Sequence, residues 1–134
     1  MTPLDIVNPE SLGAPQGFSH GVIATGGRVL FVAGQAGWSG GGRAPDFATQ
    51  FARALDQVLK VVEQAGGQPS DIARLTIYVT DLNAYKASRE ALGQHWKARL
   101  GRYYPATTLV EVKGLVDEGA VVEIEATAVI GASR

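Results

Sequence analysis

Residues 121–130 read V-V-E-I-E-A-T-A-V-I, an alternation of apolar and mostly polar side chains. A period of two is typical of a β-strand, because successive side chains of a strand point to opposite faces of the sheet. One face would carry Val122, Ile124, Ala126, Ala128 and Ile130, and the other Glu123, Glu125, Thr127 and Val129. This segment therefore predicts a long strand with one face in the core and with two carboxylates on the other face.

Four further segments predict strands upstream of it. Residues 74–80 alternate in the same way, and residues 106–112 form a β-rich run after a proline. Residues 29–33, V-L-F-V-A, are continuously apolar and predict a central strand buried on both faces. Residues 21–25 predict a short first strand, and Gly26-Gly27 predicts a hairpin turn between these two strands.

Residues 47–62 predict the first of two helices. Their apolar side chains recur at three- and four-residue spacing, which is typical of an amphipathic helix. Asp46 can cap the helix at its start, and Gly66 stands where a left-handed residue ends many helices.

The second predicted helix is capped by Asp81 or Asn83. Leu92, Trp96 and Leu100 form its apolar stripe, and the helix ends at residue 101. The resulting order β-β-α-β-α-β-β predicts an α+β fold, a mixed sheet with two helices packed on one face. The second face of such a sheet needs cover, and we expect neighbouring subunits to provide it.

Composition excludes several classes of function. The chain of 134 residues is expected to form a single domain, residues 1–134. Its net charge of -1 does not favour binding to nucleic acid or to an anionic membrane. Because it has no cysteine, a disulfide scaffold, a zinc–cysteine site and a thiol nucleophile are excluded.

The remaining sequence signals concern location and metals. No segment approaches the roughly 20 apolar residues of a membrane helix, and residues 1–12 do not resemble a secretory signal. We therefore expect a cytoplasmic protein. His20 and His95 are isolated from each other and from carboxylate clusters, so neither a zinc site nor a Ser-His-Asp triad is expected.

Five blocks, taken in order, resemble one known family. They are F-S-H-G at 18–21, V-A-G-Q at 32–35, I-Y-V-T-D-L at 77–82, Y-P-A followed by T-L-V-E-V between 104 and 112, and V-E-I-E-A at 122–126. The set resembles the RidA family, also called YjgF or L-PSP, over roughly residues 8–130. The resemblance implies a chorismate-mutase-like α+β fold. It also implies a homotrimer whose sheets form an inner barrel, with a cleft at each subunit interface.

The resemblance also implies an activity. Family members hydrolyse reactive enamines and imines to 2-keto acids and ammonia, and the chemistry requires neither a metal nor a cofactor because an imine carbon is already electrophilic. In the family, a glutamate on the last strand positions the attacking water, and an arginine after the Pro-Ala of the preceding strand binds the substrate carboxylate.

The family's functional positions are only partly retained in this chain. The glutamate is present as Glu123, whereas Thr107 replaces the arginine and Phe18 replaces a tyrosine. Arg89 occupies the position of an asparagine on the second helix. The expected site therefore has Glu123 as the catalytic residue. Phe18, Gly34, Arg89 and Thr107 are the expected substrate-binding residues.

Each of these residues has an alternative interpretation. Glu123 either orders water or is a solvated or interface carboxylate. Arg89 either supplies the cation that position 107 lacks or is an exposed helix arginine paired with a neighbour such as Glu90. Thr107 either offers its hydroxyl to a substrate or stands there for its strand propensity.

Three functions follow from this reading. The first is an enamine or imine deaminase, or a related hydrolase, acting on a small metabolite at a subunit interface. The second is a non-catalytic trimer that binds a small molecule or regulates a partner, which the apolar Phe18, Ala33 and Leu109 favour. The third is a ribonuclease, which the balanced charge and the lack of a basic stripe disfavour.

Overall fold

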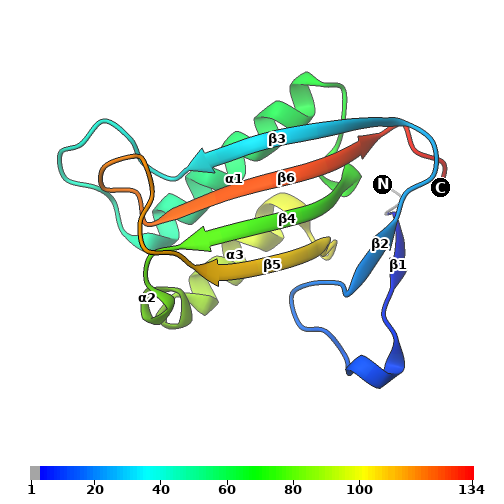
Figure 1. Ribbon diagram of the computed structural model, residues 1–134, viewed down its shortest axis with the longest axis horizontal. Helices are drawn as coiled ribbons and strands as arrows, with labels where there is room; N and C mark the ends of the chain where they lie inside the picture. Colours follow the sequence, from blue (N-terminus) through cyan, green and yellow to red (C-terminus); the bar gives the residue numbers. More distant parts are fainter. Residues whose placement is uncertain (1–3) are drawn as a thin grey trace.

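A four-stranded sheet in the order β3-β6-β4-β5 forms the centre of the computed structural model, which describes residues 4–134 (Figure 1). Its strands are β3 (Arg28–Ala36), β4 (Ile72–Val79), β5 (Ala106–Glu111) and β6 (Val122–Ile130). β6 pairs antiparallel with β3 and with β4, whereas β4 pairs parallel with β5. The expected mixed sheet is thereby confirmed, and β6 is one of its two inner strands.

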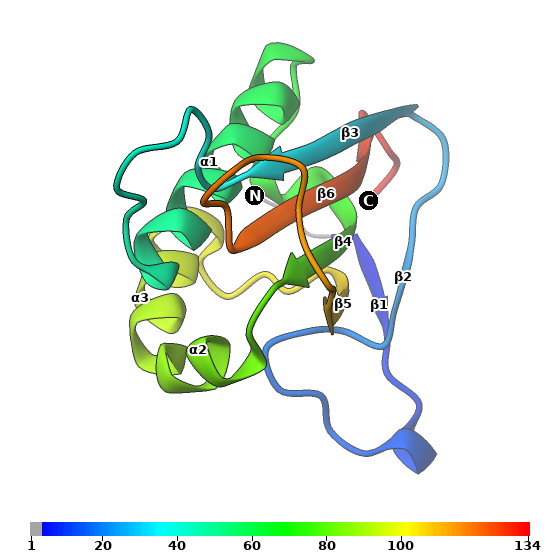
Figure 2. The same ribbon diagram turned by 60° about the vertical axis from the view of Figure 1, so that its left-hand side comes forward.

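Helices α1 (Phe47–Gln64), α2 (Leu82–Ala87) and α3 (Arg89–Leu100) all lie on one side of this sheet (Figure 2). α1 begins where the sequence predicts, since the Asp46 carboxylate accepts a hydrogen bond of 2.9 Å from the Thr49 amide. Gly66 follows the helix with a φ of 85°, a left-handed conformation that favours glycine.

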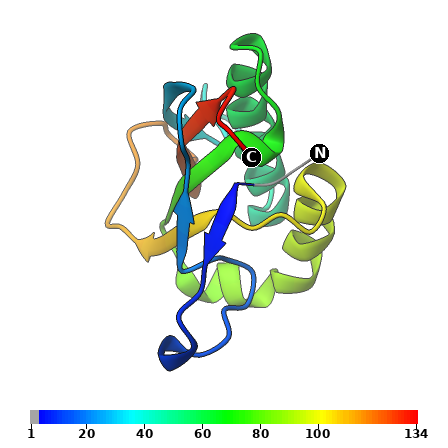
Figure 3. The same ribbon diagram turned by 90° about the vertical axis from the view of Figure 1, so that its right-hand side faces the viewer.

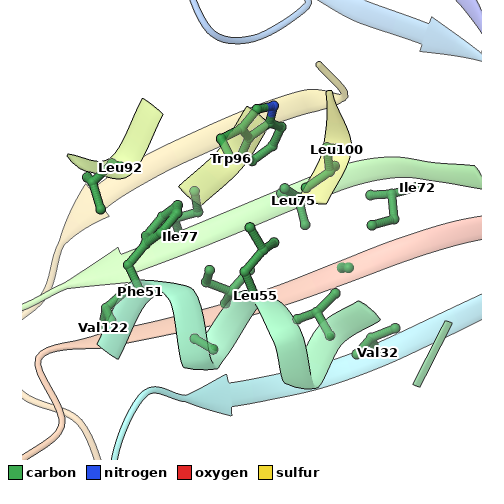
Figure 4. Packing of buried hydrophobic residues seen from close by; sticks show 14 of the residues in the cluster. Val32, Phe51, Leu55, Ile72, Leu75, Ile77, Leu92, Trp96, Leu100 and Val122 are labelled. Atoms are coloured by element: carbon green, nitrogen blue, oxygen red, sulfur yellow. The ribbon is translucent and has the colours of Figure 1, made fainter. Parts of the chain in front are cut away.

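The core lies between α1, α3 and the helix-facing side of the sheet (Figure 4). Leu55 and Val58 of α1 are fully buried against it, and burial of each such side chain contributes about 1.5–3 kcal/mol. The expected stripe of the second helix, Leu92, Trp96 and Leu100, is buried on α3. The helix-facing side of β6 is confirmed as predicted, because its even-numbered residues from 122 to 130 are all buried.

The second predicted helix is divided in two at Ser88. Asp81 is its N-cap, accepting from the amides of Asn83 and Ala84. The Ser88 hydroxyl then donates 2.8 Å to the carbonyl of Ala84, and Ser88 itself leaves the helical conformation with a φ of -101° and a ψ of 4°. A separate helix, α3, therefore begins at Arg89, which lies in the first turn of that helix.

The predicted hairpin at Gly26-Gly27 is wrong. β2 (Gly21–Ile23) pairs instead with β1 (Asp5–Val7) in a separate two-stranded sheet, which lies beside the main sheet (Figure 3). The chain after β2 is bound to the C-terminal segment, where the Ser133 amide donates 2.8 Å to the carbonyl of Thr25. Two short 3-10 helices, η1 (Glu10–Leu12) and η2 (Pro69–Asp71), complete the elements.

The prediction of a central, doubly buried strand at residues 29–33 is also wrong. β3 is an edge strand, and Val29 and Phe31 are 56% and 79% exposed on the side of the sheet away from the helices. We call this side the open face. The run is therefore apolar at an exposed edge of the sheet, and exposed apolar residues of this kind are typical of a contact surface. Among residues 4–134, no helix is both long and apolar enough to cross a membrane.

Candidate functional site

A cavity of about 440 Å³ opens on the helix side of the sheet, next to the edge strand β5. Thr107 and Leu109 line it from β5, and Ile77 lines it from β4. Both β5 residues face the helices, because Thr107 is the register partner of buried Leu75 and Leu109 that of Ile77. This cavity is the candidate ligand site of one chain.

An aromatic wall forms much of the cavity. Trp96 and Tyr104 stack with their ring centroids 5.9 Å apart and their planes 4° from parallel. The position of the Trp96 indole is set by a hydrogen bond of 3.1 Å from its N–H to the carbonyl of Tyr103. Tyr85 of α2 and Phe51 of α1 also reach the cavity. The wall therefore consists mainly of aromatic ring surface.

The lead-in segment brings Phe18 to the same cavity. Ser19 is bound to the start of β5: its hydroxyl donates 2.6 Å to the carbonyl of Tyr104, and its amide donates 3.2 Å to that of Pro105. These two bonds hold the neighbouring Phe18, with Gly17, against the cavity.

Arg89 is the lining residue with a formal charge among those that the structure describes at this cavity. Its guanidinium carbon lies 5.4 Å from the centre of the Tyr85 ring, within the range of a cation–π contact. No carboxylate in residues 4–134 forms an ion pair with it, so the pairing with Glu90 that the sequence left open is not found. Thr107 directs its hydroxyl proton to the carbonyl of Pro105 at 3.0 Å, which leaves the oxygen able to accept.

Glu123 and Gly34 lie elsewhere, together on the open face of the sheet. Tyr78 of β4 is the register partner of both Glu123 and Val110, so these three side chains point to the same face of the sheet. Val110 lies three residues after Thr107 on β5, so Thr107 points to the opposite face, and Glu123 and Thr107 lie on opposite sides of the sheet. A Cβ built on Gly34 would lie 2.5 Å from Oε2 of Glu123. The glutamate side chain therefore rests directly on the backbone of β3, at the irregularity between residues 32 and 35.

The second carboxylate of this face has a different environment. Tyr78 donates a hydrogen bond of 2.7 Å to Oε1 of Glu125, and this bond raises the pKa of the Tyr78 hydroxyl. No hydrogen bond to the carboxylate of Glu123 is found within residues 4–134. Of the two glutamates, Glu123 is thus the one whose oxygens remain available.

The five residues expected at the site therefore form two groups within one chain. Phe18, Arg89 and Thr107 line the cavity on the helix side, and Gly34 and Glu123 are in contact on the open face. The sequence reasoning missed the contribution of Tyr85 and Gly93 to the cavity. No periodic signal distinguishes them, since neither belongs to the apolar stripe of Leu92 and Trp96.

Three comparisons with known proteins agree with this architecture. The family model described as Endoribonuclease L-PSP matches residues 9–130. A RutC family protein of Pyrococcus abyssi is 30% identical over 76% of this chain and 79% of its own length. The 2-iminobutanoate/2-iminopropanoate deaminase of Escherichia coli K12 is 37% identical over 63% of this chain and 64% of its own. This chain thus spans about 64% of the length of that deaminase.

Solved structures show the same likeness. A protein of unknown function of the conserved Rid family, YyfB of Yersinia pestis, superposes with a TM-score of 0.80 at 32% identity, covering 96% of this chain and 100% of its own. E. coli TdcF with bound serine superposes with a TM-score of 0.66 at 28% identity, covering 96% and 98%. The predicted α+β fold is confirmed by these neighbours.

Proposed function

Because the chain belongs to the RidA/YjgF/L-PSP family, we propose that it is a RidA-like deaminase, or a related hydrolase, that hydrolyses an enamine or imine of a small metabolite. We propose that the reaction takes place in a cleft between subunits of a homotrimer and that Glu123 positions the water. Phe18, Gly34, Arg89 and Thr107 are the proposed substrate-binding residues.

The observation that carries the proposal is the unpaired carboxylate of Glu123, resting on Gly34. Its neighbour Glu125 is engaged by Tyr78, whereas Glu123 keeps both oxygens free within residues 4–134. A carboxylate with free lone pairs is suited to accept a proton from water. The deaminase name of the E. coli relative and the serine bound to TdcF support a substrate related to an amino acid.

The separation of the two groups supports the proposal of a cleft between subunits. Within one chain, the sheet lies between Glu123 and the cavity of Arg89 and Thr107. A second copy on the open face would cover the exposed Phe31 and could bring its own cavity towards Glu123. We therefore propose that each site combines the cavity of one subunit with the Gly34–Glu123 pair of another.

The proposed step balances without a co-reactant. Water adds to the imine carbon as Glu123 accepts one of its protons, and Glu123 passes that proton to the nitrogen, so that a neutral carbinolamine forms. Glu123 then takes the proton of the carbinolamine hydroxyl and delivers it to the nitrogen as the C–N bond breaks, so that the carbonyl forms and ammonia leaves. The net reaction converts one imine and one water into one carbonyl compound and one ammonia, as general acid–base catalysis by a single carboxylate allows.

The test is the release of ammonia from 2-iminobutanoate generated in situ by an amino acid oxidase or a threonine dehydratase. We expect release faster than in buffer or with heat-denatured protein. A rate equal to that in buffer, at protein concentrations well above those needed for a typical enzyme, would contradict the proposal for this substrate.

A non-catalytic binding trimer is the second candidate. The observation in its favour is the cavity itself, whose lining contains no carboxylate among the described residues. On this alternative, Glu123→Ala would leave ligand affinity unchanged and no imine would be turned over. A net charge of -1 gives little attraction to the phosphate backbone of RNA, which disfavours the endoribonuclease activity named in the family description.

A further inference from the structure

We infer that the cavity on the helix side takes a monocarboxylate with a bulky apolar or aromatic tail, and that Arg89 anchors the carboxylate. This inference deepens the proposed function by naming its substrate class. It concerns binding, however, and is therefore open to test whether or not the protein turns the ligand over.

The charge of the cavity selects an anion. Arg89 contributes a guanidinium, and no acidic side chain lines the cavity among the residues described. The guanidinium lies over the Tyr85 ring at 5.4 Å and forms no ion pair within residues 4–134. A planar guanidinium that is supported by a ring and free of carboxylates can receive a substrate carboxylate through two parallel hydrogen bonds.

The size of the cavity selects a large tail. A volume of about 440 Å³ falls within the roughly 300–1,000 Å³ of pockets that enclose drug-sized molecules. A three- or four-carbon acid would leave most of it unfilled. Gly93 adds to the space, since a Cβ built there meets no heavy atom within 4 Å.

The chemistry of the walls selects an apolar or aromatic tail. The stacked pair of Trp96 and Tyr104 offers flat apolar surface, and Leu92 and Leu109 add aliphatic surface. Phe18, with no hydroxyl, lines the same cavity. Rings stack on such surfaces with a gain beyond simple burial. A polar tail would lose its hydration against these apolar surfaces.

The test measures binding of three unreactive probes by calorimetry: 3-phenylpropanoate, its neutral analogue 3-phenylpropan-1-ol, and propanoate. We expect 3-phenylpropanoate to bind at least about ten-fold more tightly than either of the others. Equal affinity for propanoate would overturn the size argument, and equal affinity for the alcohol would overturn the role of Arg89.

Variants separate the role of the Arg89 charge from the role of the size of the cavity. Arg89→Ala should abolish the preference for the acid over the alcohol. Arg53→Ala is the matched control, because Arg53 also lies over an aromatic ring, Trp38 at 5.1 Å, but outside the cavity, and it should change nothing. Gly93→Leu should weaken the acid and the alcohol alike by filling the space. Arg89→Gln, which keeps a polar side chain but removes the charge, should show the same loss if the charge is the cause.

The result is independent of the proposed reaction. Selective binding without ammonia release from any imine would contradict the deaminase and leave this inference standing. Ammonia release from 2-iminobutanoate with no selectivity among the three probes, or with selectivity unchanged in Arg89→Ala, would overturn this inference and leave the deaminase standing.

Discussion

The carboxylate of Glu123 lies against the backbone of Gly34, so closely that a Cβ on that glycine would come within 2.8 Å of the carboxylate carbon. The glycine has no positive φ that would demand it. Its lack of a side chain is therefore required by the neighbouring glutamate and not by the backbone. This contact connects the edge strand β3 to the candidate catalytic residue on β6.

Gly34→Ala should displace Glu123 with little loss of stability. The clashing atoms belong to the end of a flexible side chain, which can rotate away, but the carboxylate then leaves its position. We expect ammonia release to fall by about ten-fold or more while the melting temperature changes little. Gly114→Ala is the control, since a Cβ there meets nothing within 4 Å. Unchanged activity in Gly34→Ala would show that the contact has no role in catalysis.

Glu123→Gln should lower the rate of deamination by about 100-fold or more, because the amide cannot accept the proton of water. The control is Glu125→Gln, on the same strand and face, whose carboxylate is engaged by Tyr78. It should retain activity within a few-fold, as measured in the same ammonia assay. Equal losses of activity in both variants would show that the negative charge of the open face matters in general, and that Glu123 has no specific role.

Thr107→Arg should raise the turnover of small imino acids such as 2-iminobutanoate by about ten-fold, because a guanidinium would stand where the family resemblance assigns one. The partly buried Thr107 lines a cavity with room for the longer side chain. Thr107→Val, which keeps the β-branch without a charge, is the control in steady-state kinetics. If both variants behave alike, the missing cation does not limit the reaction.

Phe31→Glu should break the proposed self-association. Phe31 is 79% exposed on the open face, and a charge there would have to be buried against a second copy. Light scattering after size exclusion should give three times the chain mass of 14.1 kDa for the natural chain and a lower mass for the variant. Val116→Glu, at a 99% exposed position outside the strands, should leave the mass unchanged. A natural chain of monomer mass would contradict the trimer.

The free energy of unfolding should fall at alkaline pH because the buried hydroxyl of Tyr103 resists ionisation in the folded state. Burial raises the pKa of its hydroxyl to about 12, and the hydroxyl donates to the carbonyl of Ile72. Because the folded-state pKa lies above the ordinary value near 10, this contribution is fully present below pH 10 and is lost as the pH rises through about 12. Urea unfolding of the natural chain at pH 9 and 11.5 should show this loss.

Tyr103→Phe is the comparison for that measurement. Removing the hydroxyl should cost about 1 kcal/mol at neutral pH, since the Ile72 carbonyl loses its partner. The variant should lose less stability than the natural chain between pH 9 and 11.5. Equal losses would show that other groups cause the alkaline effect.

Local signals predicted most of the secondary structure. The Asp46 cap, the apolar spacing of α1 and the left-handed Gly66 are each properties of neighbouring residues, and each is found. The alternation of β6 predicted the side chains that are buried on the helix side of the sheet, although Val129 on the other face is buried as well. The division at Ser88 escaped prediction because a serine hydroxyl that bonds back to the preceding turn is compatible with a continuing helix as well as with a broken one.

The two wrong strand predictions have a common physical cause. An apolar run such as residues 29–33 indicates that its side chains need cover, but it does not say whether another strand, a helix or a second subunit provides it. Likewise, two glycines permit a hairpin at 26–27, but whether β2 pairs with β3 or with β1 depends on partners distant in the chain.

The sequence by itself determined the parity of each strand, and hence that Glu123 and Val122 lie on opposite faces of the sheet. It also contains the five blocks between residues 18 and 126 that resemble the RidA family. The tertiary structure alone decided which distant residues meet: Arg89 from α3 with Thr107 from β5 around one cavity, and Glu123 from β6 on Gly34 from β3. The reason is that parity is set by the backbone of one strand, whereas proximity depends on how helices and strands far apart in the chain pack together.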